Sequence, residues 1–103
     1  MERIEKIKEM LAANPSDSFL LHALGLEYIK IGELNLAKQS FERVLVSNLN
    51  YIGTYYHLAK VNELLNEIKE AILIYEKGII VANQLKDNHA KNELQMALDD
   101  LID

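Results

Sequence analysis

Apolar residues recur along this chain at intervals of three and four positions, with charged or polar residues between them. In the N-terminal stretch RIEKIKEML, the residues Ile4, Ile7, Met10 and Leu11 fall on one side of a helix with about 3.6 residues per turn. A strand would instead alternate apolar and polar residues at every second position. The pattern predicts an all-α protein of about six helices, at residues 2–13, 17–31, 34–47, 51–65, 67–83 and 86–101.

The chain also repeats itself with a period of 34 residues. Moved forward by 34 positions, the segment FLLHALGLEYIKIGELNLAKQSFERVL lies over GTYYHLAKVNELLNEIKEAILIYEKGI. The aligned residues keep their size class, as in Leu24 and Leu58, Gly25 and Ala59, Ala37 and Ala71, and Phe41 and Tyr75. A helical bundle with accidental periodicity would not hold several independent positions at one offset, so we expect stacked helix pairs.

The first unit carries its large and small residues at fixed intervals, at Leu21, Leu24, Gly25, Tyr28, Ala37 and Phe41. This arrangement resembles the tetratricopeptide repeat (TPR) family, whose 34-residue unit carries a large aromatic, Leu-Gly, Tyr, Ala and Phe. The second unit departs from the pattern at Asn62, which replaces the tyrosine. Both units also lack the family's late proline and have Leu49 and Asn83 there.

The resemblance implies a single domain over residues 1–103, folded as a right-handed α-solenoid of stacked antiparallel helix pairs. Two TPR units would occupy residues 18–51 and 52–85. An N-terminal capping helix within residues 1–16 and a C-terminal capping helix within residues 86–103 would cover the apolar faces that two units alone leave open.

Single small residues mark where the helices of a pair should meet and end. Glycine inside a helix costs about 1 kcal/mol relative to alanine, so Gly25 needs a packing reason, such as close approach of the helix that carries Phe41. Gly32 stands where the first helix of its unit must stop and suits a left-handed C-terminal cap. Asn66, at the equivalent place in the second unit, is the next most tolerant residue for that conformation.

Composition excludes several functional classes. The chain has 50% hydrophobic and 26% charged residues and a formal net charge of −5, so it lacks the basic stripe of a nucleic-acid-binding or anionic-membrane-binding protein. It has no cysteine, which excludes disulfides, thiolate metal sites and cysteine nucleophiles. We find neither a signal peptide nor a run of about 18 apolar residues, so we expect a cytoplasmic protein.

Three of the five tyrosines lie in the stretch NYIGTYYHLAK. We expect Tyr51 to pack at the junction between units and Tyr55 to lie in the core. Tyr56 is one residue further, about 100° around the helix. In a TPR-like stack that rotation places Tyr56 on the inner surface, which is formed by the first helices of successive units.

The same geometry predicts a partner-binding groove with a mixed aromatic, apolar and basic lining. Its candidate residues are Phe19, His22, Leu26, Lys30, Tyr56, His57, Lys60, Glu63, Lys91 and Leu94. The resemblance to TPR clamps for C-terminal carboxylates is poor, because the clamp asparagines are absent and Asp87 stands where a lysine is expected. A chaperone-tail clamp is therefore disfavoured.

The leading hypothesis is a non-catalytic protein–protein interaction module that holds a peptide or helix of a partner protein, with no cofactor. The alternative is structural self-association, including a homodimer, through surplus apolar residues at Leu34, Leu36, Ile79, Ile80 and Val81. A minor alternative is a metal-binding protein or enzyme accessory subunit. His22 with His57, and His89 with Glu93, could each form part of a metal site, but neither pair has a third ligand.

Overall fold

The structure is a computed structural model that describes residues 2–103. Within that range it contains six α-helices and no strand. The helices are α1 Glu2–Ala13, α2 Ser18–Lys30, α3 Leu34–Ser47, α4 Gly53–Leu64, α5 Ile68–Leu85 and α6 Asn88–Ile102. All six predicted helices are confirmed, with shifts of three residues or fewer at their ends.

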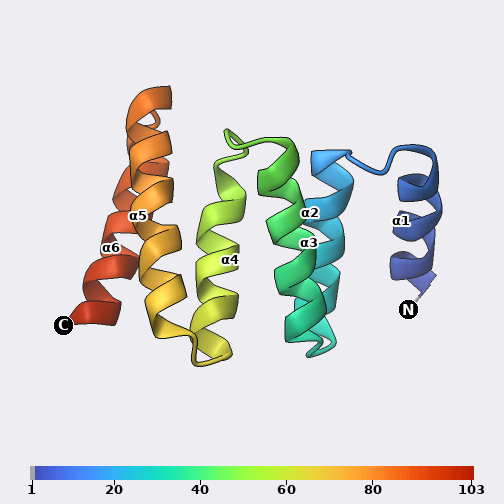
Figure 1. Ribbon diagram of the computed structural model, residues 1–103, viewed down its shortest axis with the longest axis horizontal. Coiled ribbons are helices and arrows are strands. Elements are labelled where there is room, and N and C mark those ends of the chain that lie inside the picture. Colours follow the sequence, from blue (N-terminus) through green and yellow to red (C-terminus); the bar gives the residue numbers. More distant parts are fainter. Residues whose placement is uncertain (1) are drawn as a thin grey trace.

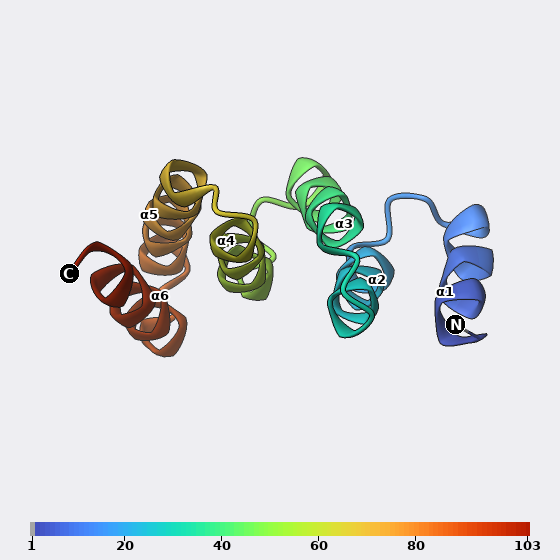
Figure 2. The same cartoon turned by 90° about the horizontal axis from the view of Figure 1, so that it is seen from below.

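The helices are stacked side by side along the long axis of a molecule that measures 40 × 28 × 19 Å (Figure 1). Each helix packs against the next one in the chain. Seen from below, α2, α4 and α6 form one row, while α3 and α5 form the opposite row (Figure 2). We call the surface formed by α2, α4 and α6 the inner face and the surface formed by α3 and α5 the outer face. The arrangement confirms an all-α solenoid.

The turns repeat together with the helices. After α2, Gly32 has φ 78°, and the N–H of Glu33 donates to the carbonyl of Tyr28 at 2.9 Å. After α4, Asn66 has φ 61°, and the N–H of Glu67 donates to the carbonyl of Asn62 at 2.8 Å. This six-residue closure caps the last carbonyls of a helix and needs a residue in the left-handed conformation. Both predicted C-terminal caps are confirmed.

The core follows the repeat positions closely. Ala37 and Ala71 are fully buried, as are the large rings of Phe41 and Tyr75 that follow them by one turn. Tyr55 is also buried and donates its hydroxyl hydrogen to the carbonyl of Leu49 at 2.7 Å. The core position expected for Tyr55 is therefore confirmed.

Gly25 lies where α2 crosses the ring of Phe41 in α3. A Cβ atom added to Gly25 would lie 2.7 Å from both Cδ1 and Cζ of that ring, a distance that real Cβ atoms essentially never show. A second close approach occurs at Gly78 in α5, where a Cβ atom would lie 2.8 Å from Cβ of Tyr55 and 3.0 Å from Cδ1 of Leu94. The two glycines let neighbouring helices pack closely, because any larger side chain would overlap Phe41 or Tyr55.

The closing helix α6 is out of step with the 34-residue period. Leu94 stands 39 residues after Tyr55, whereas Tyr55 stands 34 residues after Leu21, yet all three residues are buried. α5 has 18 residues and α3 has 14, but the connection after α5 is three residues shorter, so α6 begins only 20 residues after the start of α5, against 19 from α3 to α4. The extra turn of α5 extends beyond the neighbouring helices in Figure 1. Lys86 then reverses the chain with φ 58°.

This shift corrects one of the predicted groove residues. A constant period would place Leu94 on the inner face, but Leu94 is 2% exposed and packs with Tyr55, Tyr75 and Leu98 in the second core cluster. Its assignment to the groove was wrong, because the side of α6 that faces the core is not the side that a constant period of 34 residues predicts.

We expect Gly25→Ala to lower the free energy of unfolding by about 1–3 kcal/mol, because the new methyl group would overlap the Phe41 ring. Urea unfolding followed by circular dichroism measures the change. The matched control is Gly53→Ala, at the start of α4, where an added Cβ meets nothing within 4 Å. That variant should be neutral or more stable by up to about 1 kcal/mol. Equal effects at both positions would contradict the close approach.

Candidate functional site

Four rings gather between α2 and α4. The ring centroid of His22 lies 5.4 Å from that of His57, 5.5 Å from that of Tyr51 and 5.4 Å from that of Phe41. The His57 ring is stacked on the Phe41 ring at 6.0 Å. The cluster joins the first helices of the two repeats, because His22 comes from α2 and His57 from α4. The packing role expected for Tyr51 is confirmed.

His22 is held in place by a buried hydroxyl. Its Nδ1 atom lies 2.7 Å from Oγ1 of Thr54, which has no exposed surface. Burial, together with the smaller effect of the nearby His57, lowers the pKa of His22 to about 4. Burial also lowers the pKa of His57, although the charge of Glu93 acts in the opposite direction. Both imidazoles are therefore neutral at pH 7. Each neutral ring has one nitrogen that donates a hydrogen bond and one that accepts.

A second group of side chains on α4 holds the Lys60 ammonium beside the Tyr56 ring. The Nζ atom of Lys60 lies 5.6 Å from the centroid of the Tyr56 ring and 3.7 Å from Oε2 of Glu63. The buried hydroxyl of Tyr75 donates its hydrogen bond to that same carboxylate oxygen. Burial raises the pKa of Tyr75, and the Glu63 carboxylate raises it further, so Tyr75 stays a hydrogen-bond donor. These contacts, from Tyr75 to Glu63 and from Glu63 to Lys60, hold a positive charge at the inner surface.

A shallow hollow of about 390 Å³ extends across α2 from α1 to α4. Leu26, Lys30 and His57 from the predicted groove line it, together with Arg3 and Glu27. The Glu27 carboxylate binds Lys30 Nζ at 2.9 Å and Arg3 Nε at 3.1 Å. The hydrogen bond from Lys30 is the main cause that lowers the pKa of Glu27. The hollow therefore has an apolar floor and a rim of paired charges.

The structure brings together most, but not all, of the predicted groove residues. His22, His57, Tyr56, Lys60 and Glu63 form the two groups described above, and Leu26 and Lys30 line the hollow next to His57. Phe19 stands apart on the first turn of α2 with 70% of its surface exposed. Lys91 is half-buried in the first turn of α6. Whether a partner contacts these residues stays a prediction.

Sequence reasoning missed two polar residues of this face. Thr54 is the buried partner of His22, and Glu27 joins Arg3 to Lys30. Thr54 stands 32 residues after His22, so a signal existed in the repeat: the third position of one unit faces the fifth position of the unit before. Recognising it required knowing how far apart consecutive units are stacked.

The residues considered for metal binding do not gather into a site. His89 Nε2 lies 3.6 Å from Glu93 Oε1, and both side chains are mostly exposed. Within residues 2–103, no group of three or more His, Asp or Glu side chains is arranged to hold a metal ion. In the same range, none of the helices combines the length and apolar character that crossing a bilayer requires.

Two of the five apolar residues considered for self-association are exposed. Leu36 and Ile80 lie on the surfaces of α3 and α5, whereas Leu34, Ile79 and Val81 are half-buried. Other apolar residues on these two helices, such as Val46 and Leu73, are more exposed than Leu36. The outer face therefore carries exposed apolar side chains, and the sequence analysis predicted only some of them.

We expect the free energy of unfolding to rise with pH between about pH 4 and pH 6.5, because the unfolded chain binds a proton at His22 that the folded chain rejects. The His22→Gln variant should lose part of that slope while keeping a polar group near Thr54. Urea unfolding at a series of pH values measures it. The exposed His89→Gln variant is the control and should keep the wild-type slope. Parallel curves for wild type and His22→Gln would contradict a neutral, buried His22.

Comparison with known proteins places these features in a family. The tetratricopeptide repeat model matches residues 20–50 and 52–83, which agree with the two helix pairs. The ycf37 protein of Pyropia yezoensis is 32% identical over 80 residues, covering 72% of this chain and 45% of the relative. This chain thus spans about half the length of the ycf37 proteins that it matches.

Two solved structures illustrate the likeness in three dimensions. A tetratricopeptide repeat domain protein from Salinibacter ruber has a TM-score of 0.80 and 36% identity, covering 84% of this chain and 88% of that one. The structure of PcrH in complex with the chaperone binding region of PopD has a TM-score of 0.90 and 14% identity, covering 98% of this chain and 77% of that one. The second likeness concerns the fold alone. The chain belongs to the tetratricopeptide repeat family.

Proposed function

We propose that this chain is a non-catalytic module that binds a segment of a partner protein on its inner face. TPR proteins are in general interaction modules, which supports a protein as the partner. PcrH, which shares the fold, is described in complex with a segment of PopD. The inner face of the present chain offers a suitable surface of half-buried aromatic and apolar groups.

The observation that carries this proposal is the ordered pair of Tyr56 and Lys60. The Tyr56 ring is half-buried and fixed against the second core cluster, so little side-chain entropy is lost when a partner covers it. The Lys60 ammonium is held over that ring by Glu63 and leaves part of its surface free. Aromatic residues fixed in this way are typical energetic anchors of protein interfaces.

The charges of the inner face favour a partner of mixed character. Lys60 on α4 and Lys30 and Arg3 beside the hollow offer cations to an acidic side chain. Leu26 on the floor of the hollow and the Tyr56 ring offer apolar contacts. We propose an extended or helical segment that carries apolar anchors and at least one carboxylate.

Tyr56→Ala should weaken binding of the natural partner by about tenfold or more, the scale expected for a truncated anchor. Partners are captured from lysate of the source cells, identified, and titrated by calorimetry. Tyr56→Phe is the matched control: it keeps the ring beneath Lys60 and should bind within about threefold of wild type.

Nuclear magnetic resonance gives a second readout for the same partner. Amide shifts should concentrate on α2, α4 and α6 when the partner is added. Shifts confined to α3 and α5, or equal affinity for Tyr56→Ala and wild type, would contradict inner-face binding.

Self-association is the second candidate, because exposed apolar side chains gather on α3 and α5. Val46 and Leu73, for example, both lie on the outer face. Light scattering at high micromolar concentration distinguishes the two functions: a dimer supports self-association, and a monomer removes it.

A further inference from the structure

The outer face carries two grooves at equivalent places of the repeat. The first lies between α1 and α3 over α2, with a volume of about 220 Å³, and the second lies between α3 and α5 over α4, with about 560 Å³. Each residue that lines the first groove has its counterpart 34 positions later in the second, as Leu24 has Leu58 and Tyr28 has Asn62. The first groove therefore serves as an internal reference for the second.

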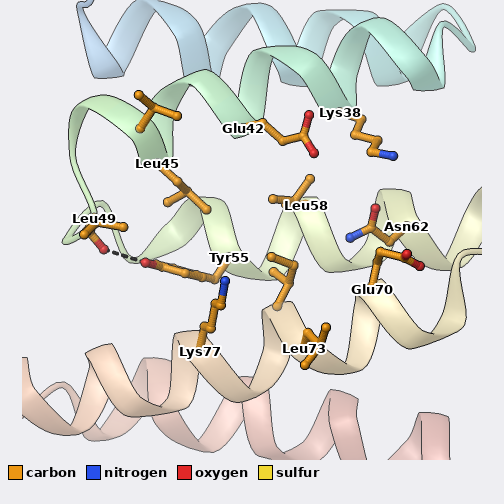
Figure 3. A pocket seen from close by; sticks show the side chains of 12 residues that line it. Lys38, Glu42, Leu45, Leu49, Tyr55, Leu58, Asn62, Glu70, Leu73 and Lys77 are labelled. Carbon is orange, nitrogen blue, oxygen red and sulfur yellow. Dashed lines mark hydrogen bonds between the residues drawn. The ribbon is translucent and has the colours of Figure 1, made fainter.

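The exchange of tyrosine for asparagine accounts for the open second groove. Tyr28 is 7% exposed, and its ring occupies the first groove, with Lys8 Nζ 6.0 Å from the ring centroid. Asn62 has a much shorter side chain, so the space that a ring fills in the first repeat is empty in the second. Figure 3 shows Leu58 and Leu73 beside this space, with Asn62 and Glu70 at one end and Leu49 with Tyr55 at the other.

Asn62 also leaves a polar atom without a partner. Its side chain is 2% exposed, and Oδ1 accepts no hydrogen bond in the described part of the chain. A buried acceptor in that condition destabilises the fold unless a donor reaches it. Because Asn62 lines the groove and the end of its side chain turns easily about its last bond, a donor that enters the groove can satisfy this oxygen.

The charges at the Asn62 end of the groove are predominantly acidic. Lys38 is engaged by Glu67, with Nζ 2.9 Å from one carboxylate oxygen and 3.0 Å from the other. Glu42 and Glu70 line the groove and form no ion pair among residues 2–103. Their counterparts in the first groove are Lys8 and Leu36, so an acidic end is particular to the second groove, and Lys77 lies toward its other end, near Tyr55 (Figure 3).

We propose that the second outer groove binds a tryptophan or tyrosine of a partner protein, from a segment that carries lysine or arginine beside it. The aromatic ring takes the place that the Tyr28 ring has in the preceding repeat and packs on Leu58 and Leu73. Its N–H or O–H donates to Asn62, and the basic neighbours approach Glu42 and Glu70. This site lies on the face opposite to the inner-face surface and does not depend on it.

The probe is a short capped peptide of alanine and lysine with one central tryptophan, titrated into isotope-labelled protein. We expect saturable amide shifts on α3, α4 and α5 near the groove. Replacing tryptophan by phenylalanine removes the donor and should weaken binding by about twofold to tenfold, the range for one hydrogen bond. Replacing it by alanine should abolish the shifts.

Two variants install first-repeat residues in the second groove. Asn62→Tyr fills the space with the ring that the first repeat has, and Leu73→Gln supplies the counterpart of Gln39; each should weaken the tryptophan peptide by about tenfold or more. Leu73→Gln changes an exposed side chain, so it reports even where Asn62→Tyr does not fold. The mirror variant Gln39→Leu lies in the first groove and should bind as wild type does.

Tyr56→Ala separates this site from the inner face, because it should leave peptide binding at the outer groove unchanged. The proposal is overturned if the tryptophan peptide gives no saturable shifts at millimolar concentration. It is also overturned if Asn62→Tyr and Leu73→Gln bind like wild type. Shifts at the groove that grow with protein concentration, without peptide, would assign the groove to a second copy of the chain instead.

Discussion

The contact between a glycine of one helix and an aromatic residue of the paired helix limits the distance between the two helices of each repeat. Gly25 meets Phe41, and Gly78 meets Tyr55, in each case too closely for any side chain larger than hydrogen. Both aromatic residues are buried at these points and exclude water from the space between the paired helices. Each repeat has one such contact, although at a different position of the 34-residue unit, and stacking of the two similar helix pairs makes the faces of the molecule repeat as well.

The two faces that result differ in chemistry although they are built from the same repeat. Side chains at neighbouring positions of α4 go in different directions, so Tyr55 enters the core while Tyr56 reaches the inner face. On the inner face, hydrogen bonds such as that from Tyr75 to Glu63 fix polar groups in place. On the outer face, apolar side chains of α3 and α5 stay exposed, and the shape of the surface depends on what fills the space between these helices.

The three- and four-residue spacing of apolar residues, together with the period of 34 residues, was enough to predict the six helices, the turns at Gly32 and Asn66 and most of the core. It failed for Leu94, because the buried side of α6 does not follow the 34-residue period. The inner groups were predicted by position, whereas the hydrogen bond between His22 and Thr54 depends on the spacing between units. The sequence did not predict the outer groove, because the groove arises where the second repeat lacks the tyrosine ring of the first. In the sequence alone, Asn62 is only a departure from the family pattern.

The ion pair between Lys38 and Glu67 has a mechanical consequence. It connects α3 to the residue that begins α5, so it ties the two helices together at one end of the outer groove. Both side chains keep contact with solvent, and dissolved salt screens such a pair. The tie between α3 and the start of α5 therefore weakens as the ionic strength of the surroundings rises.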